Sequence, residues 1–201
     1  MVSCHLGAGA SVCASSGGRS VDTTMGFTPL EGLVMATRSG SVDPGLLLWL
    51  AKHAGLSVEE ISEGLHRESG LAGLSSGSGD MREVLAARRT GDERAELAFG
   101  VYIHRLTGEV SKMTAALGGL DALAFTGAIG EHSAPVRAAT VERLGFLGLA
   151  LDDVRNSTVD GDEDISASAA AAAVLVIRTR EDLEIARQVR SLLAGRSAGA
   201  G

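Results

Sequence analysis

The sequence predicts an α/β domain with a mixed sheet flanked by helices. Strand-like runs are grouped at the start of the chain, whereas later ones alternate with helical patterns, and together these arrangements suit a mixed sheet. With 201 residues, the chain is long enough for one domain with a closed core. Hydrophobic residues make up 45% of the chain but aromatic residues only 3%. The core must therefore be built from aliphatic side chains, which suits helices packed on a sheet.

Alternating and continuous apolar runs define the strands. The first three runs are separated by turns at Gly7–Gly9 and Ser15–Gly18, which predicts a β-meander. Two later runs are continuously apolar and suit buried strands. The expected strands are Met1–His5, Ala10–Ala14, Arg19–Thr24, Ala122–Phe125 and Ala173–Ile177.

Capping signals define the helices. Asp43–Pro44 starts a helix that Gly55 ends, and Ser57–Glu60 is a capping box for the next one. Asp80 caps a short helix, and Thr90–Glu93 forms a second capping box that opens the longest one. The expected helices are Pro44–Gly55, Ser57–His66, Met81–Arg89, Thr90–Leu117, Ala134–Leu144 and Thr179–Leu193, with loops at Leu71–Gly79 and Asp152–Ser168.

The longest helix carries one continuous apolar stripe. Its members recur every three or four residues, which places them on one helix face. They are Phe99, Ile103, Leu106, Val110, Met113 and Leu117. Such a stripe indicates core packing or a helix contact between subunits, and not chemistry.

Composition excludes several classes of function. The formal charge is −7 and no Lys or Arg cluster is present, which argues against a nucleic-acid partner. The sequence shows no signal peptide and no apolar run long enough to span a bilayer, which argues against a membrane role. Cys4 and Cys13 fit no metal or redox spacing, so we expect reduced thiols in a cytoplasmic protein.

Two glycine turns and one long loop are the candidate functional segments. The turns at Gly7–Gly9 and Gly127–Gly130 each follow a strand, where backbone can approach a bound nucleotide. Purely structural turns of this kind abound in α/β proteins, and from the turn alone a structural role is favoured. The loop Met25–Gly40 is poor in charge, so we expect it to be held against another part of the molecule. Its only cation, Arg38, is expected to form a surface salt bridge, or alternatively to clamp a carboxylate or phosphoryl group.

Familiar catalytic motifs are missing. No Gly-Lys-Ser/Thr follows a glycine loop, and Gly7–Gly9 lacks the third glycine of a dinucleotide-binding turn. His5 is expected to be a packed histidine at a strand end, and Glu181 to complement a helix dipole. The acidic stretch Asp160–Asp164 lacks the glycine and glutamate of a calcium loop, so a solvated loop is expected.

Three stretches of the sequence nevertheless closely resemble acetate kinases. They are His5–Ala14, Ser20–Gly40 and Phe125–His132, and the likeness extends from Val2 to about Leu193. The resemblance implies the fold of the actin, Hsp70 and sugar-kinase superfamily, with a ribonuclease-H-like core in each of two domains. Residues 1–195 are then the C-terminal, nucleotide-binding domain, and residues 196–201 a disordered tail.

The resemblance also implies roles for individual residues. The turn after His5 approaches the nucleotide phosphates, with His5 facing the transferring phosphoryl group. Arg38 binds acetate or acetyl phosphate and stabilises charge in the transition state, and Glu181 belongs to the magnesium site. The implied nucleotide-binding residues are His5, Leu6, Gly7, Ala8, Gly9, Asp80, Met81, Arg82, Ala128, Ile129, Gly130, Glu131 and His132.

The sequence departs from the family at three of these positions. Ala8 replaces the usual Asn, which removes an amide beside the phosphates, and His132 also replaces an Asn. Ala128 replaces the usual Gly, so its Cβ is expected to crowd the nucleotide or to shift the turn. These departures bear on nucleotide affinity rather than on the fold.

The activity implied by the resemblance is reversible phosphoryl transfer between ATP and acetate, giving ADP and acetyl phosphate. Mg²⁺, or alternatively Mn²⁺, is the implied cofactor, and a homodimer is the implied assembly. The family's catalytic aspartate, a second arginine, a further histidine and a magnesium-site asparagine belong to an N-terminal domain that this sequence does not contain. The abrupt start, with strand from Val2, suggests a piece of a longer protein. We therefore expect little or no kinase activity from this chain alone. The alternatives are a non-catalytic ADP/ATP-binding module and a remnant that only dimerises.

Overall fold

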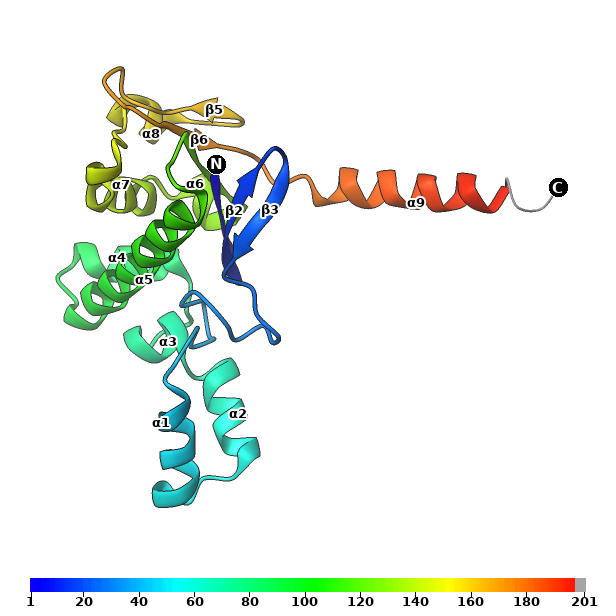
Figure 1. Cartoon of the computed structure of the whole chain (residues 1–201). Helices are drawn as coiled ribbons and strands as arrows, with labels where there is room; N and C mark the ends of the chain where they lie inside the picture. The colour runs from blue at the N-terminus through cyan, green and yellow to red at the C-terminus, as the bar shows by residue number, and fades with distance from the viewer. Residues whose placement is uncertain (198–201) are drawn as a thin grey trace.

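A computed structural model describes residues 1–197, with side chains as far as Leu193. It contains a six-stranded sheet in the order β3-β2-β1-β4-β6-β5 (Figure 1). The strands are β1 (Val2–Leu6), β2 (Ala10–Ser16), β3 (Arg19–Thr23), β4 (Ala122–Thr126), β5 (Glu163–Asp164) and β6 (Ala173–Val176). Strands β1, β4 and β6 are parallel, and the other pairings are antiparallel. The predicted mixed sheet and opening β-meander are confirmed.

The helices that the capping signals predict are present in the expected order, and the structure adds three short helices, α3, α6 and α8. They are α1 (Pro44–Trp49), α2 (Val58–Arg67), α3 (Gly70–Ser75), α4 (Met81–Arg89), α5 (Glu93–Leu117), α6 (Gly127–His132), α7 (Ala134–Arg143), α8 (Asp153–Thr158) and α9 (Glu181–Ser197). A π-helical segment, η1 (Leu50–Ala54), continues α1, and a 3₁₀ turn, η2 (Gly145–Leu147), follows α7. Within residues 1–197, no helix combines the length and the apolar character needed to cross a bilayer.

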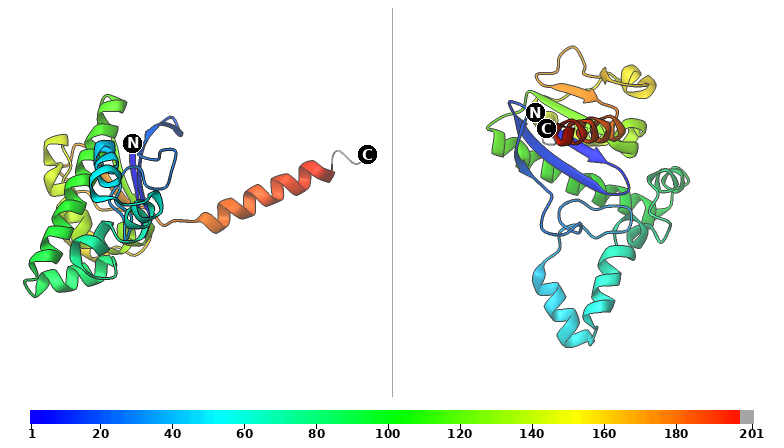
Figure 2. Two further views of the ribbon diagram at one scale, coloured as in Figure 1. Left: turned by 90° about the horizontal axis from the view of Figure 1, so that it is seen from below. Right: turned by 90° about the vertical axis from the view of Figure 1, so that its right-hand side faces the viewer.

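Helix α5 covers one face of the sheet (Figure 2). Side chains alternate along β1, so Val2, Cys4 and Leu6 are fully buried in the same core as α5. The predicted apolar stripe of α5 is confirmed, because its members from Phe99 to Met113 are at most 4% exposed. The two cysteines are both free. Cys4 lies on the buried face and Cys13 on the opposite, half-buried face, so they cannot form a disulfide. Burial raises the pKa of the Cys4 thiol.

The long loop Met25–Gly40 is held against the body of the domain, as predicted. Leu33, Val34 and Met35 are at most 5% exposed and belong to the core. The Ala36 amide donates a hydrogen bond to the Ala8 carbonyl at 3.1 Å, which ties the loop to the turn after β1. This contact positions the loop beside the candidate site.

Helix α3 corrects the prediction of a loop at Leu71–Gly79. The amides of Leu71 and Ala72 donate to the carbonyls of Met35 and Ala36, both at 2.9 Å. The loop therefore satisfies the first amides of α3, which have no partner within the helix. Leu71 is fully buried, and this burial also favours the helix. Neither partner lies nearby in the sequence, so local signals did not reveal the helix.

Three other local predictions were wrong. Thr90 does not cap α5, because the Asp92 carboxylate accepts the capping hydrogen bond from the Ala95 amide at 2.9 Å, while Thr90 ends α4. The expected loop at Asp152–Ser168 contains α8, whose cap Asp152 accepts from two following amides. The glycine turn after β4 is not a loop but the short helix α6.

Two segments project from the body of the domain (Figures 1 and 2). Helices α1 and α2, joined by η1, form an arm, defined here as Pro44–Arg67, in which no residue is fully buried. Helix α9 extends in another direction and runs to Ser197, beyond its expected end near Leu193. Residues 198–201 of the expected disordered tail lie outside the described residues.

Gly127 lies at the junction where β4 turns into α6. Its φ is +79°, and a Cβ placed there would lie 2.8 Å from the Leu6 carbonyl oxygen. We expect Gly127→Ala to lower the free energy of unfolding by at least about 2 kcal/mol, because it combines strain with a backbone clash. Gly108→Ala on α5 meets no neighbour within 4 Å and is expected to be stabilising by about 0.5–1 kcal/mol. Urea unfolding measures the free energy of unfolding of both variants, which we expect to change in opposite directions. An equal loss of stability in the two variants would contradict this prediction.

Candidate nucleotide site

A cavity of about 880 Å³ lies beside the turn after β1. Three parts of the chain form its walls: the turn after β1, the start of α4, and helix α6 together with the first turn of α7. Predicted site residues that line it are Gly7, Ala8, Asp80, Met81, Arg82, Ala128, Ile129 and His132. Residues that sequence reasoning missed are Ala36, Ser78, Gly79, Leu85, Arg89, Ser133 and Pro135. Segments about a hundred residues apart in the chain are thus brought together.

The start of α4 is fixed tightly against the long loop. Gly79 has a φ of +82°, and a Cβ there would lie 2.3 Å from the Ala36 carbonyl oxygen, so only glycine fits. Asp80 caps the helix by accepting a hydrogen bond from the Arg82 amide at 2.8 Å. The Arg82 guanidinium also pairs with the Asp80 carboxylate at 2.5 Å. These hydrogen bonds from Arg82 lower the pKa of Asp80.

Helix α6 forms the opposite wall. Ala128 lies within this helix and has no positive φ, so its Cβ requires no shift of the backbone. The strained position is Gly127 instead. Ala128 and His132 are exposed and line the cavity, whereas Gly130 is buried beneath it.

Glu131 ties α6 to the end of β6 and does not line the cavity. Its carboxylate accepts hydrogen bonds from the amides of Gly127 and Thr179 at 2.8 and 2.9 Å, and from the Thr179 hydroxyl at 2.9 Å. Burial raises the pKa of Glu131, but these hydrogen bonds and the nearby His132 outweigh it, so the pKa lies below its ordinary 4.5. Glu131 thus holds the wall in place.

The lowered pKa of Glu131 predicts a pH-dependent contribution to stability. Ionised Glu131 stabilises the fold above its ordinary pKa, and this contribution is lost as the pH falls through the lower folded-state pKa. The stability difference between the wild-type chain and Glu131→Gln is therefore expected to be largest above about pH 5 and to shrink below about pH 4. Unfolding titrations across this range measure it, with the exposed Glu142→Gln on α7 as control. A difference independent of pH would contradict the assignment.

His5 and Arg38 lie beside the glycine turn but do not line the cavity. A Cβ placed on Gly7 would lie 3.8 Å from His5 Nε2, and one on Gly9 would lie 3.6 Å from Arg38 Nη1. The predicted salt bridge of Arg38 is wrong, since no carboxylate in the described part of the chain pairs with it. Arg38 Nη1 donates only to the Pro29 carbonyl and to the Met35 sulfur. Its guanidinium is available for an anion.

The expected metal ligand is not at the cavity. Glu181 is exposed in the first turn of the projecting helix α9. Among residues 1–193, no group of three or more His, Cys, Asp or Glu side chains could hold a metal ion. The acidic stretch is solvent-exposed, as expected: Asp160 and Asp162 pair with Arg178 and Arg180, and their side chains are 86% and 38% exposed.

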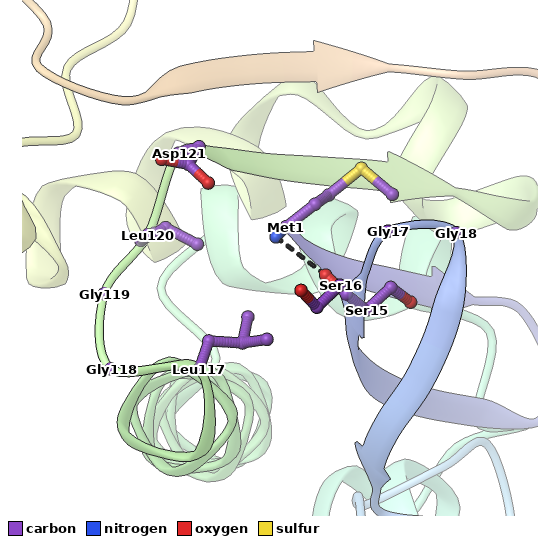
Figure 3. Close-up of a pocket in the computed structure, with 10 residues that line it drawn as sticks. All are labelled: Met1, Ser15, Ser16, Gly17, Gly18, Leu117, Gly118, Gly119, Leu120 and Asp121. Atoms are coloured by element: carbon purple, nitrogen blue, oxygen red, sulfur yellow. Dashed lines mark hydrogen bonds between the residues drawn. The ribbon is translucent and has the colours of Figure 1, made fainter.

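A second cavity, of about 470 Å³, lies at the other end of the sheet (Figure 3). Two glycine pairs form much of it, and the N-terminal amine of Met1 donates to the Ser15 carbonyl at 3.0 Å. Asp121 is the only acidic side chain among its lining residues. Without a histidine, arginine or thiol in its lining, this cavity is the weaker candidate.

Comparison with known proteins shows the family to which this chain is related. Residues 1–187 match the model of the Acetokinase family. An acetate kinase from Nostoc punctiforme is 52% identical over 193 residues, covering 96% of this chain and 48% of that protein. An acetate kinase from Deinococcus deserti is 52% identical over 199 residues, covering 98% of this chain and 50% of that protein.

Solved structures agree with this relationship. The crystal structure of Porphyromonas gingivalis acetate kinase matches with a TM-score of 0.90 at 38% identity, covering 96% of this chain and 48% of that one. A propionate kinase from Francisella tularensis matches with a TM-score of 0.85 at 40% identity, covering 90% of this chain and 46% of that one. This chain spans about half the length of its relatives and has the predicted fold of the actin, Hsp70 and sugar-kinase superfamily. Because the family model matches residues 1–187 and the relatives are about 52% identical over nearly the whole of this chain, the chain belongs to the acetokinase family.

Proposed function

We propose that this chain is the nucleotide-binding half of a phosphotransferase that moves a phosphoryl group between ATP and acetate. The observation that carries the proposal is the cavity itself. The implied nucleotide-binding residues from the turn after β1, the start of α4 and helix α6 converge on it. Its volume of about 880 Å³ is that of a site for a small molecule such as a nucleotide.

The proposed chemistry follows from how phosphoryl transfer is catalysed. The reaction needs precise positioning and positive charge on the phosphoryl oxygens, and little covalent chemistry by the protein. In this proposal the turn Gly7–Gly9 lies along the phosphates, His5 faces the transferred group, and Arg38 stabilises its charge. The Arg38 guanidinium lies beside Gly9 and has no carboxylate partner in the described chain, which supports that role. The remaining catalytic groups would have to come from outside this chain.

Magnesium is part of the proposal only through the nucleotide. Mg²⁺ is commonly held by one or two carboxylates together with substrate phosphates and water, so no protein cage is required. Glu181 fits as a single ligand because its carboxylate is exposed and makes no ion pair in the described chain. It follows Thr179 by two residues, and the Thr179 amide donates to Glu131, which holds the α6 wall of the cavity in place. Bound Mg²⁺, or Mn²⁺, would neutralise charge on the phosphates.

Calorimetry with ADP, together with a coupled acetate kinase assay, tests the proposal. We expect the 201-residue chain to bind ADP and to show no turnover. Ala128→Trp, which fills the cavity from an exposed helical position, is expected to abolish binding, whereas Ala86→Trp on the outer side of α4 is the matched control. Failure of the wild-type chain to bind ADP would refute the nucleotide site, and turnover at normal rates would refute the need for further groups.

The arm favours dimerisation as a second function. Its exposed apolar side chains include Leu48, Trp49 and Val58, which are 73%, 55% and 74% exposed. An exposed apolar surface of this kind marks an interaction site. We propose that two copies of the chain pair through their arms. Sedimentation analysis is expected to show a dimer that Leu48→Glu disrupts, while a monomeric wild-type chain would refute the pairing.

A further inference from the structure

The turn that carries Arg38 is held between two other parts of the chain. This Arg38 turn, defined here as Met35–Ser39, is closed by a hydrogen bond of 3.2 Å from the amide of its first residue to the Arg38 carbonyl. On one side, the Ala36 amide donates to the Ala8 carbonyl at 3.1 Å. On the other side lies the root of the arm, defined here as Leu65–Ala72. The placement of Arg38 therefore depends on both neighbours.

The root of the arm packs backbone against backbone on the Arg38 turn. Gly70 lies so close that a Cβ placed on it would be 2.7 Å from the Arg38 carbonyl oxygen. Four hydrogen bonds between main-chain amides and carbonyls join the two segments. They run from Ser39 to Leu65, from Ser69 to Thr37, from Leu71 to Met35 and from Ala72 to Ala36, at 2.9–3.0 Å.

Thr37 adds a side-chain hydrogen bond to this contact. Its hydroxyl donates to the His66 carbonyl at 2.9 Å. His66 lies in the last turn of α2, where carbonyls have no partner within the helix. The Thr37 hydroxyl thus satisfies the end of α2 and ties the Arg38 turn to it. A side-chain substitution at Thr37 removes this bond without removing any main-chain donor or acceptor.

The Arg38 side chain has few other contacts that fix its position. Arg38 Nη1 lies 3.4 Å from the Pro29 carbonyl oxygen, longer than an ordinary N–H···O hydrogen bond, and 3.7 Å from the Met35 sulfur. The position of the guanidinium therefore depends on the backbone of its own turn. Catalysis requires reacting groups to be placed to within about 1 Å, so a small movement of this turn is expected to cost rate.

We propose that Thr37 is a positioning residue for Arg38 and that the root of the arm is the support on which it acts. The inference rests on the proposed function, in which Arg38 stabilises charge on the transferred phosphoryl group. Without the Thr37 hydroxyl, the Arg38 turn keeps its backbone hydrogen bonds but moves more freely against α2. Arg38 then spends less time in the reactive position, whereas the nucleotide cavity, which Thr37 does not line, is unchanged.

Turnover of a full-length chain, made with the N-terminal half of the Nostoc punctiforme relative, tests this role. Thr37→Val keeps the shape of the side chain but removes the hydroxyl, so kcat is expected to fall between about tenfold and a hundredfold, with the KM for ATP changed less than about twofold. Thr37→Ser retains the hydroxyl and is expected to bring kcat to within about threefold of the wild type. Thr114→Val is the matched control, because the Thr114 hydroxyl also donates to a main-chain carbonyl at 2.9 Å, but near the end of α5.

A double-mutant comparison separates positioning from general destabilisation. If Thr37 acts through Arg38, Thr37→Val is expected to change kcat less than about twofold in an Arg38→Ala background, because the group that it positions is gone. A further loss of about tenfold or more in that background would overturn the inference, since the two effects would be independent.

Amide hydrogen exchange provides a second readout on the 201-residue chain alone. The amides of Ser39 and Ser69 donate across the contact, so their exchange is expected to be at least about threefold faster in Thr37→Val than in the wild type. The Thr24 amide donates to the Val12 carbonyl at 2.9 Å within the sheet, and its exchange is expected to be unchanged. Unchanged exchange at Ser39 and Ser69 would overturn the inference.

The outcomes separate this inference from the proposed function. If Arg38→Ala leaves the rate unchanged, the catalytic role of Arg38 fails and the role of Thr37 fails with it. A full-length chain without turnover would likewise refute both. If Arg38→Ala slows the reaction and Thr37→Val does not, only the inference about Thr37 fails.

Discussion

Arg137→Met is expected to lower the free energy of unfolding by about 3–5 kcal/mol. The Arg137 side chain is 1% exposed and donates to the carbonyls of Gly130 and Glu131, both at 2.8 Å. It also donates to the side-chain and main-chain oxygens of Asn156 at 2.8 and 2.6 Å. Methionine would leave four oxygens in the interior without these donors, and each unsatisfied acceptor is costly. Chemical denaturation under reducing conditions measures the loss.

The same network explains why Arg137 matters for the site. It joins the end of α6 to α7 and α8, and α6 is one wall of the cavity. Arg143→Met changes an exposed arginine on the same helix and is expected to shift stability by no more than about 0.5 kcal/mol. Equal effects of the two substitutions would show that the buried hydrogen bonds contribute little.

Arg38→Ala is expected to reduce the turnover of a full-length chain about a thousandfold, the lower end of what an arginine contributes to phosphoryl transfer. The full-length chain would join the N-terminal half of the Nostoc punctiforme relative to this one. Arg38 has no carboxylate partner and lies beside Gly9, so its guanidinium is free to contact the reacting groups. A coupled assay measures the rate, and calorimetry on the 201-residue chain measures ADP binding.

Nucleotide binding is the internal control for that experiment, since ADP affinity is expected to change less than about twofold. Arg38→Lys retains the charge but loses the planar fork, so it is expected to restore only part of the rate. An unchanged rate in Arg38→Ala would remove the catalytic role and leave dimerisation as the favoured function of this half.

Much of the site was predictable because its parts are local. Short stretches of sequence predict the glycine turns, the cap at Asp80 and the helix that follows it. Arg89 carries a similar local signal, since it continues the helix face of Arg82 and Leu85. What no pattern could show is that this face lies opposite His132 and Ser133. That juxtaposition depends on the packing of α4 and α6 against the turn after β1.

The sequence by itself determined the fold class, the order of the main strands and helices, the buried stripe of α5 and the family resemblance. These depend on periodicity, caps and turns, which act within a few residues. The tertiary structure alone decided that Gly70–Ser75 forms a helix, that Arg38 has no carboxylate partner in the described chain and that Arg137 is buried. Each depends on hydrogen bonds or burial involving residues distant in the chain, and such partners exist only once the chain has folded.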